Sequence, residues 1–250
     1  MKLLPFTFKI NDDLCLINTL KIDLKNQRSE TRNKRPEIRN QESGIRNQES
    51  GIRNHPCLAI LGPVGSGKSL LIKLLADSNL HEIAAYSDYP FCAYLSQDLT
   101  RLFTGNSIAS LLEIYQDKRY SVGQHFNKTL FDTVAEKFEL TQLIKENRRL
   151  MHYSEGERQR LGISLAAAVE AKVTILDEPT TALNIKHRLA LYDMIREMKS
   201  RTKVIIISHR FLDCLSVADH FIRMENLEIK EHFTLKEIIE KEHILSYYLG

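Results

Sequence analysis

Four short, mostly apolar runs along the chain predict buried β-strands. They cover residues 58–61, 91–96, 173–176 and 204–208, and each is followed by glycine or polar residues. Short apolar runs bounded by such residues are typical of strands that are covered on both faces. Residues 3–24 instead alternate apolar and polar positions, which predicts two or three short strands packed beside the main sheet.

Residues 106–150 show helical periodicity. Apolar side chains recur three and four positions apart, as in Ile108, Leu111 and Leu112. This pattern predicts a helical block over about residues 98–152, between the second and third predicted strands.

Residues 26–55 form a low-complexity tract. The seven-residue sequence at 39–45 is repeated at 46–52, with one apolar residue in each copy. Such a segment cannot bury enough surface to offset the entropy lost on ordering, so we predict a disordered surface insertion with no catalytic role.

The charge balance becomes informative once this tract is set aside. Of 35 basic and 32 acidic residues, seven and four lie in residues 26–55, which leaves 28 of each sign elsewhere. The predicted folded part is therefore neutral, and no nucleic-acid partner is expected. The chain has no run of 18 apolar residues, its polar N-terminus lacks a signal-peptide core, and its four cysteines are widely spaced. These features predict a cytoplasmic protein with reduced thiols.

The strand at 58–61 leads into a phosphate-binding loop. The loop consists of Gly62, Pro63, Val64, Gly65, Ser66, Gly67, Lys68 and Ser69. Its glycines let successive backbone N–H groups face an anion at the N-terminus of the following helix. Lys68 is predicted to contact the β- and γ-phosphates, and Ser69 to bind Mg²⁺. A glycine-rich turn without a ligand is the alternative, which the complete motif in its strand–helix context disfavours.

The strand at 173–176 ends in two carboxylates, Asp177 and Glu178. Beside a phosphate-binding loop, Asp177 is predicted to hold Mg²⁺ through water and Glu178 to polarise the attacking water. A solvated strand end is the alternative. Ser154 and Glu157 fit a capping box that starts a helix, and a capped helix N-terminus is also an anion site.

Phe8 and His209 are less specific candidates. Phe8 lies in an alternating strand, where an aromatic ring can stack on adenine but more often belongs to the core. His209 directly follows the strand at 204–208, a place where a single histidine is usually structural.

Taken in order, these motifs resemble the ATP-binding cassette (ABC) family of ATPases over nearly the whole chain except residues 26–55. The resemblance implies that residues 62–69 are the Walker A loop and that Gln97 is the Q-loop glutamine, which contacts Mg²⁺ and the attacking water and senses a membrane partner. It further implies that Asp177 and Glu178 are the Walker B aspartate and the catalytic glutamate, and that His209 is the switch histidine.

The resemblance also implies a signature loop and a D-loop. Ser154, Gly156 and Glu157 match the signature, which acts on the γ-phosphate bound by a second cassette, and residues 181–184 match the D-loop. Glu155 replaces a glycine and brings a negative charge near that phosphate, where two unit charges 4 Å apart repel by about 4 kcal/mol at an effective dielectric constant of about 20. Asn184 replaces the usual aspartate. Only 29 positions separate Lys68 from Gln97, which predicts a trimmed β-subdomain.

The resemblance implies one nucleotide-binding domain over residues 1–250, with an α/β P-loop core, a small antiparallel β-subdomain and a helical subdomain. It implies a Mg²⁺-dependent ATPase that pairs with a second cassette, as a homodimer or heterodimer. The pair would energise a polytopic membrane permease from the cytoplasmic face of the membrane. The alternatives are a soluble ABC ATPase acting on a macromolecular complex and, because of Glu155 and Asn184, a regulatory cassette with weak hydrolysis.

Overall fold

The computed structural model describes residues 7–9, 15–17, 55–69, 71, 92–99, 107–117 and 125–240 of the 250-residue chain. Its strands are β1 (Thr7–Lys9), β2 (Cys15–Ile17), β3 (Cys57–Leu61), β4 (Cys92–Leu95), β5 (Val173–Asp177), β6 (Lys203–Ser208), β7 (His220–Glu225) and β8 (Glu228–Thr234). Its helices are α2 (Ile108–Gln116), α4 (Lys128–Lys137), α5 (Thr141–Glu146), the 3₁₀ turn η2 (Leu150–His152), α6 (Glu155–Ala168), α7 (Ile185–Met198), α8 (Phe211–Leu215) and α9 (Leu235–Glu240). The four strands predicted from the apolar runs are confirmed as β3, β4, β5 and β6.

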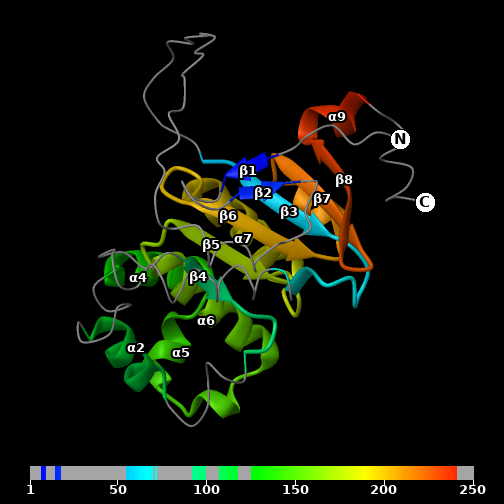
Figure 1. The fold of residues 1–250 in the computed structure, drawn as a ribbon. Helices are drawn as coiled ribbons and strands as arrows, with labels where there is room; N and C mark the ends of the chain where they lie inside the picture. Colours follow the sequence, from blue (N-terminus) through cyan, green and yellow to red (C-terminus); the bar gives the residue numbers. More distant parts are fainter. Residues whose placement is uncertain are drawn as a thin grey trace, which may run out of the picture.

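Six strands form one sheet in the order β4-β5-β6-β3-β7-β8 (Figure 1). The first five are parallel, and β8 returns antiparallel to β7. Every position of β3 and β5 is buried, as expected for parallel strands that are covered on both faces. Because the carboxyl ends of parallel strands meet at one edge, the residues that follow β3, β4, β5 and β6 are brought to the same side of the sheet.

The two faces of the sheet have separate cores. Side chains alternate along β3, so that Ala59 and Leu61 join the larger core with helices α4, α6 and α7. Leu58 and Ile60 face the opposite, smaller core with residues of β5, β6 and β7.

The helices α2, α4 and α5 lie together beside α6, on the β4 side of the molecule (Figure 1). Phe131 and Val134 of α4 are buried, and α4 packs against α6. Ser107 caps α2 and Asn127 caps α4, each by accepting a backbone N–H with its side chain. The helices predicted between residues 106 and 150 are confirmed within the described part of this region.

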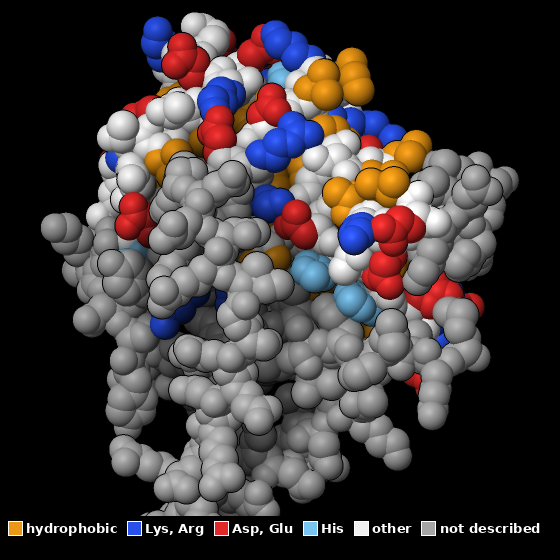
Figure 2. Space-filling view, turned by 90° about the horizontal axis from the view of Figure 1, so that it is seen from above, with side chains coloured by type: hydrophobic (Ala, Val, Ile, Leu, Met, Phe, Trp, Pro, Cys, Tyr) orange, Lys and Arg blue, Asp and Glu red, His pale blue; other side chains and the backbone are white. Residues whose placement is uncertain are grey.

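Strands β1 and β2 pair antiparallel as a separate two-stranded sheet, which agrees with short strands in residues 3–24. Of the low-complexity tract, only His55 belongs to the described residues, so the prediction of disorder lies outside them. Among the helices that the structure describes, none is both long and apolar enough to cross a membrane. The face seen in Figure 2 carries acidic and basic side chains intermingled over its described part.

Candidate nucleotide-binding site

The phosphate-binding loop leaves β3 at Leu61 and enters a helix at Lys68. Ser66 N–H donates to Pro63 O at 3.2 Å, which closes the loop on itself. Gly62 has a φ of 151°, and a Cβ there would lie 2.2 Å from the backbone oxygen of Met224. Glycine is therefore required at this position by a close approach of two backbones.

The turn between β7 and β8 supports the loop from outside. Leu227 N–H donates to Ser66 O at 3.1 Å. A Cβ on Gly67 would lie 2.3 Å from Leu227 Cδ2, so this side chain lies directly against the loop. Asn226 and Leu227 have φ values of 51° and 63°, the left-handed pair that a two-residue hairpin turn requires. This contact is not predicted from the sequence, although Asn226 between two alternating segments is a recognisable turn signal.

The Lys68 ammonium is held inside the loop. Its Nζ donates to Gly62 O and Pro63 O, each at 2.8 Å, and to Ser66 Oγ at 3.4 Å. Burial lowers the pKa of Lys68, and the nearby Glu178 and Asp177 carboxylates oppose that shift. The loop thus carries a buried cation among backbone groups, an arrangement suited to phosphate.

Asp177 ends β5 and is only 1% exposed. Tyr94 OH in β4 donates to Asp177 Oδ2 at 3.0 Å. Burial raises the pKa of Asp177, while hydrogen bonds from Ser69 and Tyr94 oppose the rise. Asp177 Oδ1 is buried and has no hydrogen-bond partner among the described residues. A carboxylate oxygen left open beside the Ser69 hydroxyl suits a hard cation such as Mg²⁺.

Glu178 and His209 are brought into contact. Glu178 has a φ of 50° and anchors its N–H on Ile207 O at 2.9 Å. A left-handed glutamate is uncommon and is found where the surrounding structure imposes it, often at functional sites. His209 Nδ1 lies 2.9 Å from Glu178 Oε1, and His209 N–H donates to the same oxygen at 3.0 Å.

For two candidate residues, Gln97 and Phe8, only the position relative to a strand is known. Gln97 follows β4, whose end pairs with β5 at Leu95 and Leu176, and its side chain is exposed. Gln97 therefore lies near the carboxyl end of β5, without a hydrogen bond to Asp177. Phe8 lies within β1, and its side chain is outside the described part of the structure.

Ser154 and Glu157 close the predicted capping box at the start of α6. Ser154 N–H donates to Glu157 Oε2 at 2.7 Å, and Glu157 N–H donates to Ser154 Oγ at 3.2 Å. Within the described residues, no hydrogen bond joins Ser154, Gly156 or Glu157 to the phosphate-binding loop.

Residues 154–157 pack against the turn at 181–184. A Cβ on Gly156 would lie 2.8 Å from Ala182 O, so glycine is needed here. Glu155 takes ordinary helical backbone and is exposed. Asn184 caps α7 by accepting His187 N–H at 2.9 Å, so the amide performs the capping role open to an aspartate at this position.

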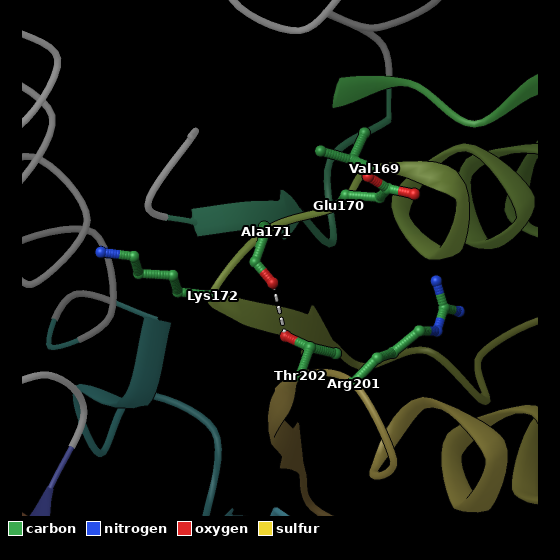
Figure 3. A pocket seen from close by; sticks show the side chains of 6 residues that line it. All are labelled: Val169, Glu170, Ala171, Lys172, Arg201 and Thr202. Atoms are coloured by element: carbon green, nitrogen blue, oxygen red, sulfur yellow. Dashed lines mark hydrogen bonds between the residues drawn. The ribbon is translucent and has the colours of Figure 1, made fainter. Parts of the chain in front are cut away.

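A separate cavity of about 410 Å³ lies at the opposite ends of the strands, where β5 and β6 begin (Figure 3). It is lined by Val169, Glu170, Ala171, Lys172, Arg201 and Thr202. These residues precede β5 and β6, whereas the loop, Glu178 and His209 follow strands. The cavity is therefore not part of the candidate site.

Fold and site together define a P-loop nucleotide-binding protein of the α/β class. Residues 45–181, a little over half of the chain, match the family described as ABC transporter. The chain belongs to this family.

Individual relatives agree with that assignment. The phosphate import ATP-binding protein PstB of Saccharolobus solfataricus is 29% identical over 210 residues, 72% of this chain and 77% of that protein. The sulfate/thiosulfate import ATP-binding protein CysA of Bacillus cereus is 29% identical over 73% of this chain, but the match spans only 55% of CysA. A solved structure of an ATP binding subunit of an ABC transporter shares the fold, with a TM-score of 0.61 at 18% identity, covering 77% of this chain and 84% of that one.

Replacing Gly62 by Ala is expected to destabilise the protein more than replacing Gly65. Both glycines have positive φ, for which a non-glycine residue costs about 1–2 kcal/mol. Only Gly62 also faces a backbone oxygen, since nothing lies within 4 Å of a Cβ on Gly65. Urea unfolding of both variants measures the difference. Equal losses of unfolding free energy would contradict the proposed packing of the β7–β8 turn on the loop.

Proposed function

We propose that this chain binds and hydrolyses ATP and thereby drives transport through a separate membrane permease. The observation that carries the proposal is the Glu178–His209 contact, 2.9 Å long, at the sheet edge that also holds the phosphate-binding loop and Asp177. A carboxylate oriented by an imidazole beside a phosphate site suits activation of a water molecule.

The phosphates of ATP would lie in the loop formed by residues 62–69. The backbone N–H groups of Gly65 and Gly67 would face them, and the Lys68 ammonium would exchange the Gly62 and Pro63 carbonyls for β- and γ-phosphate oxygens. Phe8 remains the proposed stacking partner for adenine.

The donors present fit a magnesium ion. Ser69 and Asp177 would hold it, with Gln97 as a further oxygen ligand. When bound, Mg²⁺ supplies positive charge that offsets the negative charge of the phosphates. Glu178 would accept a proton from the attacking water, and His209, which orients Glu178, would also contact the γ-phosphate.

A second cassette is proposed to complete the site. Ser154, Gly156 and Glu157 would reach the γ-phosphate of the partner cassette. In agreement with this, no hydrogen bond among the described residues joins them to the loop of their own chain. Exposed apolar residues support such a partner: Val64 in the loop is 93% exposed and Ile185, which begins α7, is 70% exposed. The partner is either a second copy of this chain or a different cassette.

The comparisons favour the transporter over a soluble ABC ATPase. The family is described as ABC transporter, and the relatives named above are import ATP-binding proteins. A polytopic permease on another chain, with this subunit on the cytoplasmic face of the membrane, is the arrangement we propose.

The Glu178→Gln variant is expected to bind ATP normally and to lose turnover by about 10²-fold or more, since general-base catalysis contributes about 10²–10⁴. It should also accumulate as an ATP-bound dimer, measured by size-exclusion chromatography with ATP. Glu170→Gln, the same change at the far cavity, is the control and should hydrolyse ATP like the parent. Unchanged turnover in Glu178→Gln would remove Glu178 from its role.

The Tyr94→Phe variant tests the metal assignment. Loss of the hydrogen bond to Asp177 should weaken divalent-cation binding about fivefold, the equivalent of about 1 kcal/mol. Binding of Mn²⁺ in the presence of ATP, followed by electron paramagnetic resonance, measures this without hydrolysis. Tyr115→Phe, in α2, is the matched control. An unaltered Mn²⁺ affinity in Tyr94→Phe would show that Tyr94 does not orient a metal ligand.

The permease is tested by affinity purification of the tagged chain from membranes solubilised in mild detergent. A polytopic membrane protein recovered in stoichiometric amount, with ATPase activity stimulated in the complex, is the expected result. Recovery of the chain only with soluble macromolecular complexes would replace the transporter by the soluble ATPase.

A further inference from the structure

The Glu178 carboxylate has a third donor besides the two from His209. Ser208, the last residue of β6, is 1% exposed, and its Oγ donates to Glu178 Oε2 at 3.4 Å. The same Oγ accepts Arg210 N–H at 3.0 Å. A hydroxyl that accepts on one side has its single proton free for the other, so the Arg210 N–H directs the Ser208 proton toward Glu178.

Side-chain contacts also hold the segment after Ser208 in place. Arg210 Nε lies 3.0 Å from Asp213 Oδ2 in α8. Asp213 Oδ1 accepts Tyr192 OH from α7 at 2.8 Å. Burial and the hydrogen bond to Asp213 raise the pKa of Tyr192, so its phenol stays a donor. The contacts thus run without a break from the Glu178 carboxylate through residues 208–213 to α7.

The terminal torsion of a glutamate is broad, so the plane of its carboxylate is free to rotate unless donors hold it. His209 holds only Oε1 of Glu178, through both its ring and its backbone N–H. Among the described residues, Ser208 is the donor to Oε2. Holding the second oxygen as well as the first fixes the plane of the carboxylate. A fixed plane keeps a lone pair aimed at one position for the attacking water.

We propose that Ser208 is a positioning residue for Glu178, which sets the plane of the carboxylate through its hydroxyl. This inference rests on the proposed role of Glu178 as the general base. Because Ser208 is only 1% exposed, it would act on Glu178 and not on substrate or metal directly. Its loss should therefore lower kcat for ATP hydrolysis and leave nucleotide affinity unchanged.

The test compares kcat, KM and the affinity for a fluorescent ATP analogue in variants of the full chain. Ser208→Ala is expected to lower kcat three- to tenfold, with KM and affinity within twofold of the parent. Ser208→Thr keeps the hydroxyl and should restore kcat to within twofold. Ser208→Cys keeps the volume with a weak donor, and should also lower kcat if the alanine variant fails to fold.

Thr202→Val is the matched control. Thr202 is buried just before the other end of β6, and its hydroxyl donates to Ala171 O at 2.8 Å. The control should leave kcat unchanged. Normal kcat in Ser208→Ala and Ser208→Cys, with Glu178→Gln inactive, would overturn this inference and leave the proposed function intact. An active Glu178→Gln would instead overturn the proposed function. Parallel loss of kcat, affinity and thermal midpoint, without rescue by Thr, would reduce Ser208 to a structural role.

Discussion

The register of three parallel strands governs the whole site. Asp177 pairs with Ile207 across β5 and β6, and Leu61 pairs with Ser208 across β3 and β6. The phosphate-binding loop, the two carboxylates and His209 therefore leave the sheet at the same level. Because side chains alternate faces along a strand, a slip of one residue would turn Asp177 away and separate Glu178 from His209. The backbone hydrogen bonds between the strands thus determine where the side chains of the site lie.

Around this edge, support comes from segments outside the recognised motifs. The β7–β8 turn presses on the loop from one side, through Met224 and Leu227. Tyr94 holds Asp177 from the neighbouring strand. Gln159 in α6 donates to Pro179 O at 3.2 Å and so ties the capped helix to the segment after Glu178. Lys68, Asp177 and Glu178 are buried, and each has hydrogen-bond partners that restrict its movement.

The sequence predicted the elements whose signals are local. Apolar runs located β3 to β6. The loop motif, the Asp177–Glu178 pair and the capping box were each recognisable because the residues within each motif lie a few positions apart. The contacts it missed join distant positions, such as Tyr94 with Asp177 across 83 residues and Ser208 with Glu178 across 30. These depend on strand order and register, which apolar periodicity does not specify. The low-complexity tract and the adenine contact of Phe8 stay predictions, since they fall outside the described side chains.

Because residues 154–157 pack against the turn at 181–184, the neighbouring positions 155 and 156 differ in whether they can accept a side chain. Gly156 meets Ala182 O and has no room for a side chain, whereas Glu155 is exposed on a normal helical backbone. Of the two glycines usual in the family signature, only the second is demanded by the fold of this chain. The fold leaves the residue at position 155 open, because its side chain is exposed. In the proposed dimer, the charge that position 155 tolerates would be set by the surface of the partner cassette rather than by the fold of this chain.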